Sequence, residues 1–157
     1  MSDQTTRFGV KAPTLEDIVA PGFSTPWDAP MVPPFPFKFR DCRIMTLYWR
    51  TDPDAIDFLL PPPLKRTGDI ACAHIYQMND PDWIGPYGEM NVMVGAELPG
   101  KASGGYSPYL ALSSDGGVVH GREVHGQPKK HGNPQIEVRG DLLVGSVERN
   151  GIDVLTG

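Results

Sequence analysis

The chain has 157 residues, which is one domain's worth and enough to bury roughly two-thirds of the surface of its unfolded state. Hydrophobic residues make up 39% and charged residues 21%, as in ordinary soluble proteins, and no apolar run is long enough to span a bilayer. The formal net charge of -5 argues against a surface that follows phosphates. Neither a membrane nor a nucleic acid is therefore an expected partner.

The first residues contain no basic segment followed by an apolar stretch, so they do not predict a secretory signal. The two cysteines, Cys42 and Cys72, fit a reducing compartment. A cytoplasmic location is expected.

Seventeen prolines and eighteen glycines interrupt helices and supply turns throughout the chain. Residues 1–40 form a proline-rich N-terminal arm with one short helix over residues 14–20, where Thr14 followed by Asp17 resembles a capping box. A second short helix is expected after Asp52, ended by the prolines at 61–63, and a third over residues 115–124.

Between these helices, short runs of β-forming residues are separated by stretches rich in proline and glycine. Asn150-Gly151 is a strong type I′ hairpin signal between two such runs. Strands are expected over residues 42–50, 70–78, 89–97, 108–113, 135–140, 142–149 and 152–157.

Many short strands with few helices predict a mainly β (α+β) fold over residues 41–157, as a closed or cone-like barrel of mixed or antiparallel strands. The last predicted strand reaches the end of the sequence without its next ladder partner. We therefore expect further polypeptide to complete the barrel, either as a second chain or as a continuation beyond residue 157.

The segment GREVHGQPKKHGNP, residues 121–134, places two adjacent lysines between a proline and flanking glycines. If the two ammonium groups lie close together, their repulsion favours a neutral amine on one of them. A Schiff-base nucleophile requires a neutral amine. A lone pair of lysines is more often solvated at the surface, so the dipeptide alone does not decide between these interpretations.

In its context, the segment resembles the signature of the acetoacetate decarboxylase family, which has GRE followed by PKK and a glycine. The resemblance extends upstream to RTDPDAI and PPPL and downstream to DLLVGSVERNG, so that it covers residues 35–157. The matching residues are Gly121, Arg122, Glu123, Pro128, Lys129, Lys130 and Gly132.

The resemblance implies that Lys129 forms an imine with a small oxo acid, that Lys130 helps to keep Lys129 uncharged, and that Glu89 in the segment YGEM is the catalytic acid or base. Taken alone, Glu89 would more often be an exposed carboxylate at a strand edge. Arg122 and Glu123 are interpreted as a scaffold for the lysine loop. A homo-oligomer without a cofactor is expected, and four histidines without a metal-binding spacing predict no metal site.

Two positions depart from the family pattern. Cys42 takes the place of an arginine that holds the substrate carboxylate, and Arg43 could replace that arginine only if a β-bulge intervenes. His74 takes the place of a second buried glutamate, where it is either a proton shuttle or a packed structural histidine. His125 and Gln127 lie within the lysine loop as candidate substrate-binding residues, and His120 and His131 flank it.

Three functions are compatible with these features. The first is a lysine-imine lyase that acts by decarboxylation or by aldol or dehydration chemistry. The second is a self-processed hydrolase of amide-like bonds, whose nucleophile is the first residue of a second chain following Gly157. The third is a non-catalytic protein that keeps the fold and uses its cavity to bind a small molecule.

Overall fold

The computed structural model describes residues 14–19, 31–32 and 36–157. In the arm it describes helix α1, Leu15–Val19, whose N-terminus is capped by a capping box as the sequence predicts. The Thr14 hydroxyl accepts a hydrogen bond from the Asp17 amide (3.1 Å), and the Asp17 carboxylate accepts one from the Thr14 amide (2.8 Å). The proline-rich remainder of the arm lies outside the described residues.

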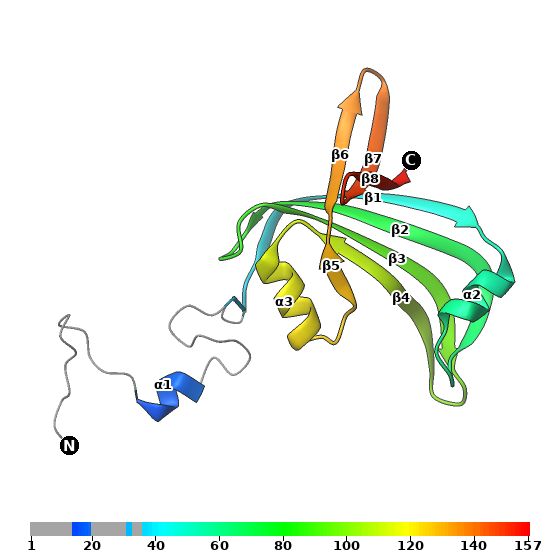
Figure 1. Ribbon diagram of the computed structural model, residues 1–157, viewed down its shortest axis with the longest axis horizontal. Helices are drawn as coiled ribbons and strands as arrows, with labels where there is room; N and C mark the ends of the chain where they lie inside the picture. The colour runs from blue at the N-terminus through cyan, green and yellow to red at the C-terminus, as the bar shows by residue number, and fades with distance from the viewer. Residues whose placement is uncertain (1–13, 20–30, 33–35) are drawn as a thin grey trace.

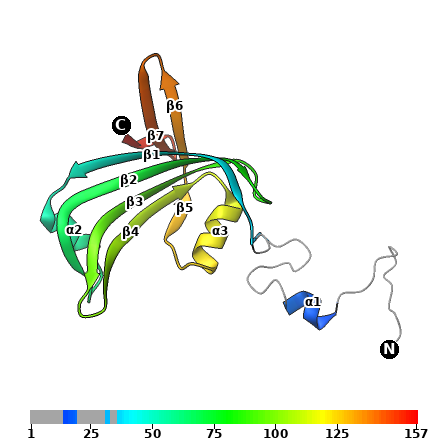
Figure 2. The same ribbon diagram turned by 180° about the vertical axis from the view of Figure 1, so that it is seen from behind.

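A five-stranded sheet dominates the structure, in the order β1-β2-β3-β4-β5. All neighbouring strands are antiparallel except β4 and β5, which are parallel and are therefore joined by a crossover through helix α3, Asp115–Glu123. The sheet is strongly curved, and α3 lies on its inner side (Figures 1 and 2). The strands are β1 Phe39–Arg50, β2 Lys65–Pro81, β3 Tyr87–Leu98, β4 Ala102–Leu112 and β5 Lys129–His131.

A second sheet of three antiparallel strands packs on the outer side of the first (Figure 1). Its strands are β6 Asn133–Arg139, β7 Leu142–Arg149 and β8 Ile152–Thr156. The β7–β8 turn has positive φ at Asn150 and Gly151, as a type I′ turn requires. The core between the sheets is formed by the fully buried side chains of Ile75, Met90, Ala111 and Val147.

Helix α2, Pro53–Leu59, forms between β1 and β2 as the sequence predicts. The Asp52 carboxylate accepts a hydrogen bond from the Asp54 amide (2.9 Å), and Pro53 opens the helix. Ile56 and Leu60 bury their side chains against β2 and β3, whereas Phe58 on the opposite side of α2 is 90% exposed. The helix is therefore anchored by one narrow apolar stripe.

The expected fold class is confirmed, because the described part of the chain is mainly β with short helices. The expected closed barrel is not present there: both sheets are open, and β1 and β5 are the edges of the larger one. That further polypeptide completes the barrel stays a prediction. Across the described residues, no helix is long and apolar enough to cross a membrane.

Candidate active site

The inner face of the five-stranded sheet, which we define as the face that carries Glu89 and Lys129, is crossed by two adjacent rows of side chains. Strand register places one residue of each strand in each row, and alternate residues of a strand share a face. The first row is Ile44, Tyr76, Glu89, Leu112 and His131. The second row is Thr46, His74, Asn91, Leu110 and Lys129.

Lys129 is a buried lysine at the end of the second row, with only 7% of its surface exposed. Its Nζ lies 3.3 Å from each carboxylate oxygen of Glu89, whose side chain is 12% exposed. Glu89 is on β3, the central strand of the sheet, so it is not the edge carboxylate that its sequence context alone would suggest. A lysine is seldom this buried unless it is paired, and Glu89 supplies the opposite charge.

Helix α3 covers the Lys129 side chain at a glycine. A Cβ atom at Gly121 would lie 2.1 Å from Cδ and 2.5 Å from Cε of Lys129, so only glycine allows the helix to pack this closely. Arg122, the next residue, donates a hydrogen bond from Nη1 to the backbone oxygen of Lys129 (3.1 Å). The GRE segment therefore covers the lysine and holds its backbone, in agreement with the scaffold role expected for Arg122.

Two tyrosines surround the Glu89 carboxylate. Tyr76 is its cross-strand neighbour on β2, and Tyr87 lies two residues before it on β3. Burial and, after it, the charge of Glu89 raise the pKa of each phenol, most strongly that of Tyr87. Both phenols stay protonated at neutral pH, so they do not act as bases.

Lys130 occupies the opposite side of β5 from Lys129. Its side chain is exposed, and its Nζ lies 5.4 Å from the centroid of the Tyr109 ring. Successive residues of a strand point to opposite faces, and both lysines are in β5. The expectation that the two ammonium groups lie close together is therefore not met. The neighbour of the Lys129 amine is the carboxylate of Glu89 instead.

The register of β1 decides the position of Arg43. Cys42 pairs with Met78, Arg43 with Gln77 and Ile44 with Tyr76, so the ladder carries no bulge at this point. Cys42 shares the inner face with Tyr76 and Glu89, and Arg43 projects from the other face. The condition that would have brought Arg43 to the site is not met.

His74 lies in the second row and is held through both ring nitrogens. Nδ1 is 2.9 Å from the hydroxyl of Thr46, and Nε2 is 3.6 Å from the thiol of Cys72. Beside it, Oδ1 of Asn91 is a buried oxygen for which the described residues supply no hydrogen-bond partner. His74 therefore shares the inner face with Glu89 and Lys129, in a fixed orientation.

Helix α3 and the loop that follows it bring two further histidines together. The rings of His120 and His125 meet edge to face at 4.7 Å, and Phe37 packs on His120 at 5.2 Å. Burial, then the nearby His125 and Lys129, lower the pKa of His120. Gln127 contributes its backbone: its amide donates to the Gly121 oxygen (2.9 Å), and its oxygen accepts from the Lys129 amide (2.8 Å).

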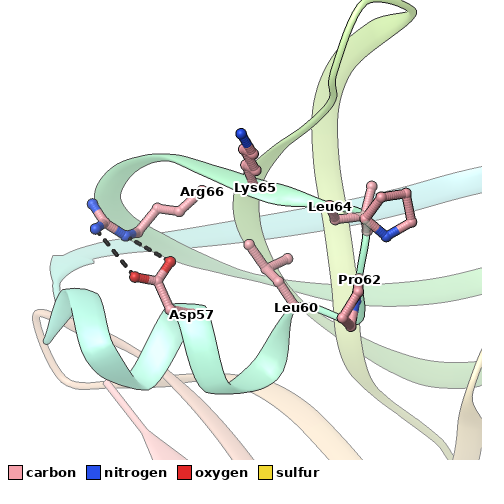
Figure 3. A pocket seen from close by; sticks show the side chains of 7 residues that line it. Asp57, Leu60, Pro62, Leu64, Lys65 and Arg66 are labelled. Atoms are coloured by element: carbon pink, nitrogen blue, oxygen red, sulfur yellow. Dashed lines mark hydrogen bonds and ion pairs between the residues drawn. The ribbon is translucent and has the colours of Figure 1, made fainter.

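A groove of about 600 Å³ lies elsewhere, between the end of α2 and the start of β2, where Arg66 pairs with Asp57 at 3.0 Å (Figure 3). None of the residues that line this groove belongs to the two rows of the inner face. Within the described ranges, no three His, Cys, Asp or Glu side chains are grouped as a metal ion would require. The candidate site is therefore the covered Lys129–Glu89 pair with its flanking histidines and tyrosines.

The candidate site is a buried lysine on the inner face of a curved β-sheet. Comparison with known proteins identifies the family to which the chain belongs. The family model for acetoacetate decarboxylase matches residues 20–157. Acetoacetate decarboxylase 1 of Bradyrhizobium diazoefficiens is 33% identical over 133 residues, which are 85% of this chain and 53% of that protein. The chain belongs to the acetoacetate decarboxylase family.

Solved structures support the same conclusion. A structure of acetoacetate decarboxylase aligns with a TM-score of 0.82 at 30% identity, over 91% of this chain and 58% of the other. The acetoacetate decarboxylase of Legionella pneumophila aligns with a TM-score of 0.76 at 27% identity, over 94% and 59%. The chain thus spans a little more than half the length of the relatives it matches.

Proposed function

We propose that the protein is a lyase that forms a Schiff base between Lys129 and the ketone of a small oxo acid. The observation that carries the proposal is the buried contact of the Lys129 amine with the Glu89 carboxylate at 3.3 Å. Burial keeps bulk water from the amine, and the Glu89 carboxylate is close enough to accept its proton in the proposed reaction. Membership of the acetoacetate decarboxylase family supports a lysine-imine lyase over the binder and the hydrolase.

The chemistry needs no group beyond these residues. Glu89 accepts a proton from Lys129, the amine nitrogen bonds to the ketone carbon, and the carbonyl oxygen takes up a proton that this nitrogen loses. This oxygen then leaves as water, with Glu89 returning a proton, and a protonated imine remains. The positive nitrogen accepts the electron pair of the bond that breaks next.

Decarboxylation is the reaction that the family and the named relatives favour. In that case the electron pair of the bond between the carboxylate and its neighbouring carbon moves into the imine, and carbon dioxide departs. The resulting enamine is protonated and hydrolysed. Aldol and dehydration reactions start from the same imine. These reactions stay alternatives for this chain because Cys42 and His74, which depart from the family pattern, both lie on the inner face. A homo-oligomer stays part of the proposal.

Borohydride trapping tests the proposal. The protein is incubated with acetoacetate or pyruvate, reduced, digested and analysed by mass spectrometry. A reduced adduct is expected on the peptide that contains Lys129, and it should disappear in Lys129→Ala. The matched variant Lys130→Ala should keep the adduct, because Lys130 projects from the other side of β5. Absence of any adduct in the wild type would refute the Schiff-base mechanism.

Release of carbon dioxide from acetoacetate then separates the reactions. Decarboxylation predicts release that depends on Lys129 and Glu89. Adduct formation without such release, together with consumption of an added aldehyde in the presence of pyruvate, would instead assign aldol chemistry.

A further inference from the structure

An oxo acid presents a carboxylate, and the basic side chains that sequence reasoning would assign to it do not reach the reacting amine. Arg43 projects from the outer face of β1, and Lys130 from the outer side of β5. Arg122 is committed to the backbone oxygen of Lys129. A carboxylate bound beside Lys129 therefore needs another donor among the described residues.

His120 and His125 are basic side chains that flank the GRE segment covering Lys129. His120 directly precedes Gly121, the residue whose Cα packs against the Lys129 side chain. The rings of the two histidines lie 4.7 Å apart, and Phe37 packs on His120 from the arm. The His120 side chain is half-buried and the His125 side chain is exposed.

We propose that His120 and His125 bind the substrate carboxylate during imine formation at Lys129. The inference rests on the proposed function, because it concerns the second functional group of the same oxo acid. An imidazole N–H donates a hydrogen bond to a carboxylate oxygen, and the bond strengthens if the ring takes up a proton. His125 can reorient towards a ligand because it is exposed, whereas His120 is fixed by its ring contacts.

The electrostatics of the site support this assignment. The charge of Lys129 helps to lower the pKa of His120, so the ring and the amine are close enough to affect each other. A carboxylate placed between them offsets the mutual repulsion of these basic groups. It also leaves Glu89 free to exchange protons with the reacting nitrogen. The substrate class is accordingly an oxo acid with its ketone at Lys129 and its carboxylate towards the α3–β5 loop.

The test compares 4-oxopentanoate with 4-oxopentanamide, which have the same shape and ketone but differ in charge. Affinity is measured by ligand-observed NMR, and imine formation at Lys129 by borohydride trapping in the same samples. The wild type is expected to bind the acid about tenfold more tightly than the amide. His125→Phe and His120→Phe keep an aromatic ring and remove the donors, so each should reduce this ratio towards one.

Lys130→Ala is the control. It removes another exposed basic side chain next to Lys129, but one that projects from the other side of β5, so it should keep the wild-type ratio. Equal affinity of the two probes in the wild type, or an unchanged ratio in both ring variants, would overturn the carboxylate site. If neither probe is trapped while the acid still binds through the histidines, the Schiff-base function fails and the carboxylate site stands.

Discussion

The absence of a side chain at Gly121 makes room for Lys129, and the Glu89 carboxylate supplies the opposite charge. The lysine side chain passes through the space that a Cβ atom at position 121 would fill, under a helix that the Arg122 contact ties to the same strand. The amine is thereby directed to Glu89 and kept away from solvent. Gly121 and Glu89 are consequently the two residues whose replacement should reveal how the lysine works.

Gly121→Ala should displace the lysine or the helix, because the new Cβ would lie 2.1 Å from Lys129 Cδ. Alanine favours helix formation, so without this clash the change would stabilise α3. We expect a net loss of about 1–3 kcal/mol in the free energy of unfolding and a slower formation of the Lys129 adduct. Denaturant unfolding and adduct mass measure both effects.

Gly68→Ala is the control, since nothing lies within 4 Å of a Cβ at that position. Wild-type stability and trapping in Gly121→Ala would contradict the described packing of α3 on the lysine.

Glu89→Gln should remove the proton acceptor and leave a side chain of the same shape. Because general acid–base catalysis typically contributes about 10²–10⁴-fold, turnover of the oxo acid should fall by about 100-fold or more. Steady-state kinetics provide the measurement. Glu97→Gln, on the same strand but exposed, should retain full activity. Similar rates for the two variants would exclude Glu89 as the acid or base.

Residue-level prediction from sequence succeeded where a motif carries its own geometry and failed where geometry depends on strand register. The PKK motif and its flanking GRE identified the buried lysine and its cover. The identity of the residue next to Lys129 in space could not be inferred from adjacency, because alternation along β5 separates Lys129 from Lys130. Likewise, only the uninterrupted register of β1 shows which face Arg43 occupies.

At the scale of elements, alternation predicted parts of the longer strands, and helices α2 and α3 were also expected. Strand β4 begins at Ala102, within a stretch interpreted as a glycine-rich connection, so only its second half was predicted. Alternation did not predict β5, whose three residues are too few to show a pattern and which the sequence presents only as part of a loop. This strand exists because Lys129, Lys130 and His131 pair with Leu110, Ala111 and Leu112 of β4. A long-range pairing of this kind is set by the tertiary fold and not by local preference.

Two substitutions in helix α2 test which of its side chains hold it on the sheet. Ile56→Ala removes a fully buried side chain from the contact with β2 and β3 and should cost about 2–5 kcal/mol in the free energy of unfolding. Phe58→Ala, two residues along the same helix, removes a side chain that is 90% exposed and should change stability by about 0.5 kcal/mol or less. Chemical denaturation compares the two, and equal losses would contradict the described orientation of α2.

At the scale of the whole molecule, the two sheets have different roles. The outer sheet, β6 to β8, buries the core against one face of the larger sheet, and the opposite face is left to the candidate site and α3 (Figure 2). The mainly β class was predictable from composition and turn signals. Closure into a barrel was not, because the pairing of edge strands is not encoded in any local pattern.

The pH dependence of global stability should report on His120. Its pKa is lowered in the folded state, so between the unfolded value of about 6.5 and the folded value the unfolded chain binds more protons. Stability should therefore fall as the pH decreases from 7.5 to 5.5. His120→Phe preserves the ring packing and should flatten this dependence, as thermal unfolding at both pH values would show. The same slope in both proteins would contradict the assigned environment of His120.

Carbonyl-oxygen exchange tests the central claim most directly, whichever reaction follows the imine. Formation and hydrolysis of a Schiff base replace the ketone oxygen with oxygen from water, so in ¹⁸O-labelled water the ketone should acquire the label at a rate that depends on the enzyme. Mass spectrometry should find this exchange with the wild type and Lys130→Ala, and lose it with Lys129→Ala. Turnover of an oxo acid with retention of the original ketone oxygen, or exchange that persists without Lys129, would contradict the account.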